Sequence, residues 1–407
     1  MRAMACVRSG LLAAVVLVTA AAASAQTNGP PYESARTARV TGGGEFAGIF
    51  GPPDDIAFFN FTDYESNALR LVRLRLFGEW RPAPRLSFLG EVRLENGRDV
   101  DLAALYVRWL PLASRAFEIR AGRVPPLVGA FPRRAYGRDN LVLGIPLAFQ
   151  YVTSLRSDAL PRTIDDLLRM RGRGWQPSYP IGSSELAPGV PMVSTADWDT
   201  GVEASWRHDG FDASVGLTQG APAVPVVRDR SRGWQWSGRV GAAFKSGLTI
   251  GASAAHGAWL DDDVAALVAA PGVDARDQTV AGVELEYGRG PFLARAEWLA
   301  SRFSLPLAEL GGTELTLGTQ AGYVEARYRV TPRADIAMRL DRLTFSPVTG
   351  SNGVATSWDA QVDRVEAIGS YRVNRHFDLR AGWQHNWRPA GRVHRRGYPV
   401  VAVLFWF

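Results

Sequence analysis

The chain has 407 residues, with 46 basic and 40 acidic side chains and a formal net charge of +6. Arginines and carboxylates alternate along its whole length, which is unlike the clustered basic face of a nucleic-acid-binding protein, so we expect no nucleic-acid partner. The single cysteine, Cys6, excludes an internal disulfide. After residue 25 no stretch approaches about 18 consecutive apolar residues, which excludes a helical membrane anchor.

The first 25 residues have the layout of a secretory signal peptide. Arg2 and Arg8 precede a short apolar run that ends in the small residues Ala23-Ser24-Ala25. Cys6 lies before this run, so it is no lipid attachment site. We predict a signal peptide over 1–25 and an exported, thiol-free mature chain over 26–407. Losing two arginines leaves 44 basic against 40 acidic side chains, a net charge of +4.

The rest of the chain repeats a two-residue period. Over 86–95, for example, apolar Leu86, Phe88, Val92 and Leu94 alternate with polar and charged neighbours. Side chains of a β-strand point alternately to opposite faces, so each such segment has one apolar and one charged face. About sixteen segments follow this pattern: 37–50, 69–81, 85–96, 101–110, 116–124, 197–208, 211–219, 234–245, 248–258, 277–288, 291–303, 319–331, 334–345, 359–373, 376–387 and 398–407.

The connections between these segments also alternate. Very short turns such as Asp209-Gly210 and 288–291 are followed by mostly longer loops, near 51–67, 220–233, 259–276, 304–318, 346–358 and 388–397. This alternation is typical of an up-and-down meander. Aromatic residues gather near the segment ends, as in the belts at membrane–water interfaces: Trp80, Trp109, Trp198, Trp206, Trp236, Tyr287, Trp298, Tyr328, Tyr371, Trp383 and Trp406.

A sheet that crosses a membrane must close on itself, because hydrocarbon offers its backbone no hydrogen-bond partner. The sequence therefore predicts an all-β fold, a closed antiparallel transmembrane β-barrel of about sixteen strands. We expect short turns on the periplasmic side and longer loops outside.

The last segment, "YPVVAVLFWF" at 398–407, ends on a phenylalanine of the lipid-facing row. With the signal peptide, strand number and loop alternation, this ending resembles the outer-membrane porins. The resemblance implies a bacterial outer-membrane location, passage of small hydrophilic solutes and a possible homotrimer. It also implies contact with outer-membrane lipid and an assembly signal at Tyr398, Phe405 and Phe407, read by the barrel-assembly machinery. Within this group, "IRAGRVPPLVGAF" at 119–131 is similar to a strand end of phosphate-selective porins.

One connection, 125–196, is far longer than the others, and such loops are usually functional or disordered. Its apolar and aromatic content argues against disorder. We predict a short helix capped by Thr163, with Asp165 and Asp166 at its positive end. In general porins the loop after the fifth strand narrows the pore, and the resemblance implies the same here. The candidate constriction residues are Arg133, Arg134, Arg138, Arg156, Arg162, Asp165, Asp166, Arg169, Arg171 and Arg173.

Because arginine side chains favour anions, we expect the pore to prefer them. Further arginines are predicted to line the lumen wall: Arg73, Arg75, Arg93, Arg120, Arg239, Arg327, Arg329, Arg339, Arg364 and Arg380. The alternative is that these arginines only pair with acidic neighbours and hold the wall together. The candidate partners are Glu79, Glu91, Glu118, Glu325, Asp341, Glu366 and Asp378.

The chain offers little for catalysis or metal binding. Asp261–Asp263 with Asp274 is a weak calcium candidate, and His385 and His394 are not spaced as a zinc motif. No histidine pairs with a serine at motif spacing, and we expect no enzyme activity, metal or cofactor. Only about a dozen residues separate Gln26 from Ala38, too few for a plug domain of an energy-coupled transporter. The alternatives are a barrel hydrolase acting on lipids, a structural or adhesive barrel, and, remotely, a soluble periplasmic β-protein.

Overall fold

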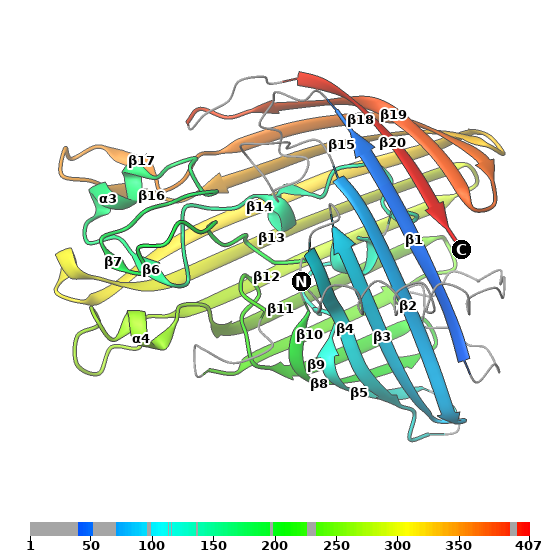
Figure 1. Cartoon of the computed structure of the whole chain (residues 1–407), viewed down its shortest axis with the longest axis horizontal. Helices are drawn as coiled ribbons and strands as arrows, with labels where there is room; N and C mark the ends of the chain where they lie inside the picture. The colour runs from blue at the N-terminus through cyan, green and yellow to red at the C-terminus, as the bar shows by residue number, and fades with distance from the viewer. Residues whose placement is uncertain are drawn as a thin grey trace, which may run out of the picture.

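The computed structural model describes residues 40–51, 71–95, 99–112, 114, 116–135, 137–195, 198–225, 233–390 and 397–407. The predicted signal peptide lies outside these residues. Sixteen strands of the described chain form a closed antiparallel barrel (Figure 1). They are β1 (Val40–Phe50), β2 (Leu71–Ala83), β3 (Leu86–Glu95), β4 (Asp99–Trp109), β5 (Phe117–Val124), β8 (Asp199–His208), β9 (Phe211–Thr218), β10 (Gln235–Ala243), β11 (Leu248–Ala258), β12 (Asp277–Arg289), β13 (Phe292–Leu307), β14 (Thr313–Thr331), β15 (Ala334–Phe345), β18 (Val362–Asn374), β19 (Phe377–Trp387) and β20 (Gly397–Trp406).

The remaining elements are short and lie in the connections. The long connection after β5 contains η1 (Phe131–Arg134), α2 (Leu147–Gln150), α3 (Ile164–Arg169) and the small hairpin of β6 (Ala159–Leu160) with β7 (Ile181–Gly182). Later connections contain α4 (Asp262–Ala265), η2 (Ala308–Leu310) and the hairpin of β16 (Pro347–Thr349) with β17 (Ala355–Ser357). No helix among the described residues is long and apolar enough to cross a membrane.

The predicted fold class and strand number are confirmed, and one predicted loop is wrong. The segment 304–318 is mostly strand: β13 extends to Leu307 and β14 begins at Thr313, so only a short turn that contains η2 separates them. Leu305 and Leu317 are fully buried there because they belong to one hydrophobic core with residues of the connection after β5. Because the inner residues here are apolar, the segment lacks the alternation of apolar and polar side chains on which the strand prediction depends.

The barrel closes between its first and last strands. β1 pairs with β20 from Glu45–Trp406 to Phe50–Val401. The backbones of Gly44 and Phe407 exchange two further hydrogen bonds of 3.1 Å. Every strand of the barrel sheet therefore has two neighbours, so within the described residues this sheet has no open edge.

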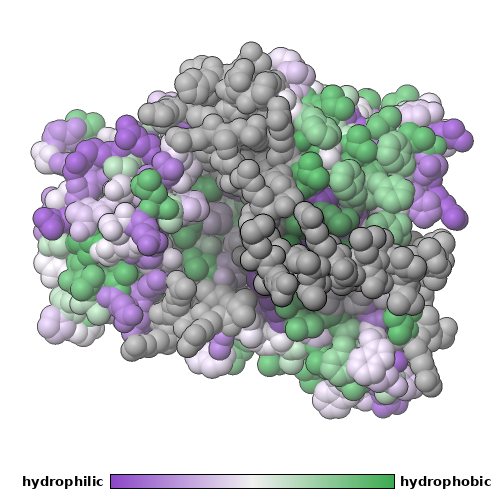
Figure 2. Space-filling view, viewed as in Figure 1, coloured by the Kyte–Doolittle hydropathy of each residue, from purple (hydrophilic) through white to green (hydrophobic). Residues whose placement is uncertain are grey.

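The outer face of the barrel is apolar, as the alternation predicts. Val324, Tyr328 and Val401 are about half exposed on it, whereas Glu325, between the first two, is 2% exposed on the inner side. In Figure 2 hydrophobic residues cover much of the barrel wall, and hydrophilic residues gather at the end that carries α3 and β16. An apolar outer wall without sheet edges is the form in which a sheet can cross a bilayer.

The two ends of the barrel differ. At one end, tight turns such as Asp209–Gly210 join neighbouring strands, with Asp209 at a φ of 47° and Gly210 at a φ of 81°. The other end carries the long connections. Figure 1 shows α3, α4, β6, β7, β16 and β17 gathered at that end. This asymmetry matches the predicted pattern of short turns and longer loops.

Candidate functional site

The connection after β5 turns back against the inner wall of the barrel. Carboxylates of the wall accept hydrogen bonds from its backbone N–H groups. Glu366 accepts from Leu143 at 2.9 Å and from Gly144 at 2.8 Å, and Asp341 accepts from Leu147 at 2.7 Å. Hydrogen bonds to a charged acceptor are stronger than neutral ones, so these contacts fix the path of the chain.

Arginines of the same wall bind the carbonyl groups of this connection. Arg339 donates to the carbonyl of Gly144 at 2.6 Å, Arg364 to that of Ile145 at 3.0 Å, and Arg380 to that of Asn140 at 2.8 Å. The three arginines stand on β15, β18 and β19. The wall thus satisfies both donors and acceptors of a stretch of chain that forms no regular structure.

The charges that hold this connection belong to an ordered row on the wall. Glu286, Arg295, Glu325, Arg339 and Glu366 are direct cross-strand neighbours on β12, β13, β14, β15 and β18. Arg295 lies 2.7 Å from Glu286, and Arg339 lies 2.5 Å from Glu325. Opposite charges on facing positions stabilise neighbouring strands, so the row stiffens this half of the barrel.

Towards the long-loop end the inner wall becomes apolar. Leu299, Phe303, Leu317 and Leu343 are at most 1% exposed and form one hydrophobic core with the connection after β5. From the connection itself this core takes Val128, Phe131, Leu147, Ala148, Phe149, Tyr151, Leu155, Ala159, Leu160, Leu167, Tyr179, Val190, Met192 and Val193. The connection is therefore a packed element inside the barrel and not a loose loop over its mouth.

Asp359, between β17 and β18, ties this element to the barrel rim. Its carboxylate is fully buried and accepts N–H groups from Gly172 and Ser154, both at 2.7 Å, and from Ala360 at 2.6 Å. Burial raises the pKa of Asp359, while these three N–H groups act in the opposite direction. One side chain thus holds the backbone of the connection at two separate places, Ser154 and Gly172.

Replacing this carboxylate by an amide is expected to release the connection. In Asp359→Asn the amide NH2 must face at least one of the donors, which leaves a buried N–H unsatisfied at a cost of about 1–3 kcal/mol. Trypsin should then cleave the refolded protein next to Arg171 or Arg173 roughly tenfold faster. Asp274→Asn, at an exposed loop carboxylate, is the matched control. Equal cleavage of the Asp359 variant and the wild type would contradict this anchoring role.

The opposite wall, formed by β2 to β5, is rich in arginine. Arg75 on β2 directly faces Arg93 on β3, and Arg108 on β4 directly faces Arg120 on β5. Facing like charges are unfavourable between strands. Carboxylates lie between the arginines: Glu91 is 3.8 Å from Arg75, Asp101 is 3.2 Å from Arg93, Glu79 is 2.6 Å from Arg108, and Glu203 is 3.5 Å from Arg120.

Solved structures of similar architecture were found, whereas no family model and no curated protein matches the chain. In vitro folded OmpT, an outer membrane protein of Vibrio cholerae, has 12% identity and a TM-score of 0.55, over 92% of this chain and all of that one. OmpF of Salmonella typhi, in complex with daunomycin, has 14% identity and a TM-score of 0.53, over 90% and 97%. An anion-selective porin from Comamonas acidovorans has 13% identity and a TM-score of 0.52, over 90% and 99%.

The chain has the fold of the outer-membrane porins. The likeness covers 90–92% of this chain and 97–100% of the chains compared. At these identities it concerns the backbone fold and not individual side chains.

Within this porin fold, the predicted constriction residues separate into three groups. Arg133 and Arg134 lie at mid-wall, where Arg133 is 3.1 Å from Glu284 and Arg134 is 3.0 Å from Glu286. The guanidinium of Arg138 lies 6.0 Å from the ring centre of Trp406. These three remain near the inner wall of the strands.

A second group lies at the rim. The predicted helix and its cap are confirmed, because the Thr163 hydroxyl accepts the N–H of Asp166. Asp165 binds Ser351 of the β16–β17 hairpin, and hydrogen bonds from that serine lower the pKa of Asp165. Four of the predicted residues occur in or next to α3 at this rim: Arg162, Asp165, Asp166 and Arg169. Arg171, partly buried, and Arg173, exposed, follow directly after α3.

Arg156 alone makes up the third group. It is 2% exposed and binds Asp158, the carbonyl of Pro177 at 3.1 Å and the carbonyl of Glu185 at 2.7 Å. All of these partners lie within the connection itself. Its charge therefore holds the connection in shape.

The arginines that the alternation predicts at the lumen wall have different partners in the structure. Arg339, Arg364 and Arg380 hold the connection, whereas Arg75, Arg93 and Arg120 stand on the opposite wall. Arg239, on β10, pairs with Asp212 and Glu284. Arg329, at the short-turn end of β14, is exposed and 3.4 Å from Asp335. Arg73 and Arg327 are half-buried on β2 and β14.

Sequence reasoning missed several groups of this site. Arg108 follows the same two-residue alternation as its neighbours, so the sequence pattern alone could have identified it as an inner-wall residue. Asp359 and Glu297, which accepts the N–H of Ala130 at 2.8 Å, carry no local signal, because their partners lie far away in the chain.

The weak metal candidates have other partners. Asp262 and Asp274 both pair with Arg276. Among the described residues no group of three or more His, Cys, Asp or Glu side chains could hold a metal ion. His385 packs beside Trp387, with ring centres 4.3 Å apart, and His394 lies outside the described residues.

Proposed function

We propose that the protein is a passive diffusion channel of the bacterial outer membrane for small hydrophilic solutes, with a preference for anions. The observation that carries this proposal is the position of the connection after β5. It is hydrogen-bonded to one inner wall, while arginines face each other on the opposite wall. The solute path then runs between the connection and β2 to β5.

In this arrangement the connection sets the width of the channel and the arginine wall sets its charge preference. Arg75 and Arg93 face each other on β2 and β3, and Arg108 and Arg120 do so on β4 and β5, seven residues further along β4 than the position that faces Arg93. All four side chains are at most 9% exposed, so we propose that they act on passing anions mainly through their field. Of the loop residues, we assign Arg133, Arg134 and Arg138 to the path and the α3 residues to its outer entrance. A similar solved barrel is described as an anion-selective porin, which accords with this assignment.

No catalytic chemistry is required for such a function, because the protein supplies a wet path, a width limit and an electrostatic filter. We propose that residues 1–25 direct export and that the final strand, with Tyr398, Phe405 and Phe407, is read by the barrel-assembly machinery. A homotrimer is the assembly that the porin fold makes us expect.

Single-channel recording tests the proposal. Mature protein refolded into a planar bilayer should give a stable conductance, and its reversal potential under a salt gradient should indicate anion preference. Cation preference would retain the channel and reject the arginine filter. Absence of conductance from folded, inserted protein would reject the channel itself.

One observation favours the second candidate, a barrel hydrolase acting on lipids. On the outer wall, His256 Nδ1 lies 2.9 Å from the Thr279 hydroxyl, and His256 Nε2 lies 3.6 Å from the Asp277 carboxylate. A hydroxyl, a base and an orienting acid are the components of nucleophilic catalysis. Release of fatty acid from phospholipid or lipid A, abolished by His256→Ala, would establish this activity. Equal release from His256→Ala and the wild type would reject it.

A further inference from the structure

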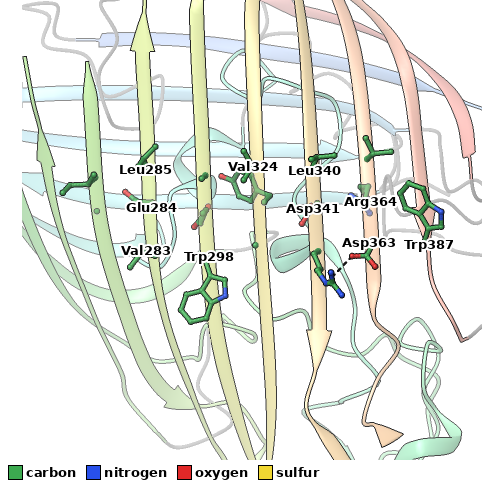
Figure 3. A pocket seen from close by; sticks show the side chains of 18 residues that line it. Val283, Glu284, Leu285, Trp298, Val324, Leu340, Asp341, Asp363, Arg364 and Trp387 are labelled. Atoms are coloured by element: carbon green, nitrogen blue, oxygen red, sulfur yellow. Dashed lines mark ion pairs between the residues drawn. The ribbon is translucent and has the colours of Figure 1, made fainter. Parts of the chain in front are cut away.

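The outer wall of the barrel has a groove of about 980 Å³ across β11 to β19 (Figure 3). A barrel wall is convex, so a groove on its outer face is unexpected. It follows two adjacent rows of outward-facing residues. The row nearer the long-loop end consists of direct cross-strand neighbours on six strands: Val283, Trp298, Gly322, Arg342, Asp363 and Trp387.

Differences in side-chain size within this row produce the groove. Gly322 has no side chain and stands between Trp298 and Arg342. A Cβ at Gly322 would lie 3.4 Å from Trp298 Cδ1 and 3.3 Å from the carbonyl of Glu297, so a larger residue would fill the space. Trp298 and Trp387 are each almost half exposed and flank the groove.

The groove is apolar at one end and charged at the other. Its lining on β11 to β14 includes Ile250, Leu285 and Val324, whereas β15 and β18 add the charged pair of Arg342 and Asp363 beside the apolar Leu340 and Val365. Arg342 Nε lies 3.4 Å from Asp363 Oδ1, and the two side chains are 65% and 38% exposed. Figure 3 shows Asp363 beside Trp387, with Leu285 and Val283 at the opposite side.

The charged end lies at the long-loop end of the barrel. Ile250 is the third residue of β11, counted from the short-turn end, whereas Asp363 is the second residue of β18 and Trp387 the last residue of β19, both at the long-loop end. Since strands of such barrels tilt by about 35–45°, a row across them rises through the membrane. The groove therefore runs obliquely from the hydrocarbon to the headgroup level, where tryptophan is favoured.

We propose that this groove binds one phosphorylated glycolipid of the outer leaflet. An acyl chain lies over Val324 and Leu285, and a headgroup phosphate pairs with the guanidinium of Arg342. Arg342 has five N–H donors in a planar fork, so it can bind phosphate while it keeps its ion pair with Asp363. The Asp363 carboxylate then accepts a hydrogen bond from a hydroxyl of the headgroup. The proposal depends on the outer-membrane location proposed above and not on channel selectivity.

A lipid suits this groove better than a second copy of the chain. The charged pair is already neutral within one barrel, so a facing wall of the same apolar character would bury it without new partners, which is costly. A lipid headgroup instead adds hydrogen bonds to both charges. The apolar section and the charged section match the two parts of a single lipid molecule.

Native mass spectrometry of the refolded full-length mature chain, titrated with lipid A in detergent, tests the proposal. Wild-type protein should retain one lipid A, with affinity lowered roughly tenfold by Arg342→Gln, because a charge-assisted hydrogen bond is lost. Gly322→Leu should lower it as well by filling the groove. Arg302→Gln is the matched control, because Arg302 is an exposed arginine that does not line the groove.

Equal retention by wild type and Arg342→Gln would overturn the proposal, as would equal retention of lipid A and its dephosphorylated form. A barrel dimer that Gly322→Leu dissociates would assign the groove to a second copy instead. Channel conductance recorded from the same samples keeps this test separate from the proposed function, because the groove and the lumen lie on opposite faces of the wall.

Discussion

Replacing residues 140–190 by a short Gly–Ser linker is expected to raise the single-channel conductance several-fold. The connection occupies the lumen against β12 to β19, and ion flow increases with the free cross-section. The replacement also exposes Leu299, Phe303, Leu317 and Leu343 to water, and each loses about 1.5–3 kcal/mol of burial. The variant should therefore unfold at a lower temperature than the wild type.

The matched control for this replacement is excision of the exposed hairpin-tip residues 352–354, which keeps Ser351 and its hydrogen bonds to Asp165 and should leave the conductance unchanged. If the long replacement fails to fold, Glu366→Ala provides a milder test. It keeps the hydrophobic core but removes the acceptor for the N–H groups of Leu143 and Gly144, and the open level should fluctuate more. Unchanged conductance of a folded 140–190 replacement would show that the connection does not restrict the path.

Neutralising the facing arginines is expected to abolish the anion preference. Arg75→Gln with Arg93→Gln, and Arg108→Gln with Arg120→Gln, should each shift the reversal potential toward that of a cation-preferring pore. The two shifts should add in the fourfold variant. The shifts should shrink in 1 M salt, where the Debye length is about 3 Å, because screened charges act only over short distances.

Stability is measured beside selectivity in the same variants. Glu91 and Glu79, the partners of Arg75 and Arg108, are almost fully buried, so loss of the arginines leaves buried carboxylates with fewer ionic partners and should lower the unfolding temperature. A structural role alone predicts this loss of stability with an unchanged reversal potential, whereas the filter predicts a shifted reversal potential in variants that remain folded. Arg289→Gln, an exposed arginine at the end of β12, is the control for total charge. An unchanged reversal potential in the fourfold variant would reject the arginine wall as the filter.

The sequence alone determined the barrel and nearly all of its strands. A two-residue period is a local property, because each side chain points to lipid or lumen according to its own position along a strand. Turn residues and aromatic belts are local too. The cap of α3 was predictable for the same reason, since Thr163 and Asp166 are three residues apart.

The tertiary structure decided what the inner wall does. The final strand is apolar on both faces, with Val400 and Ala402 almost fully buried in one cluster with residues 141–143. The sequence pattern accounts only for its lipid face. The extensions of β13 and β14 were missed for the same reason, because the connection after β5 buries their inner residues.

The register between neighbouring strands decides which residues face each other at the site. The alternating row from Glu286 to Glu366 and the facing arginines on β2 to β5 bring together residues from separate strands. A shift of one residue between two strands would move a side chain to the opposite face. Spacing along the chain cannot predict such neighbours, because the pairing of strands is set by the closure of the whole barrel.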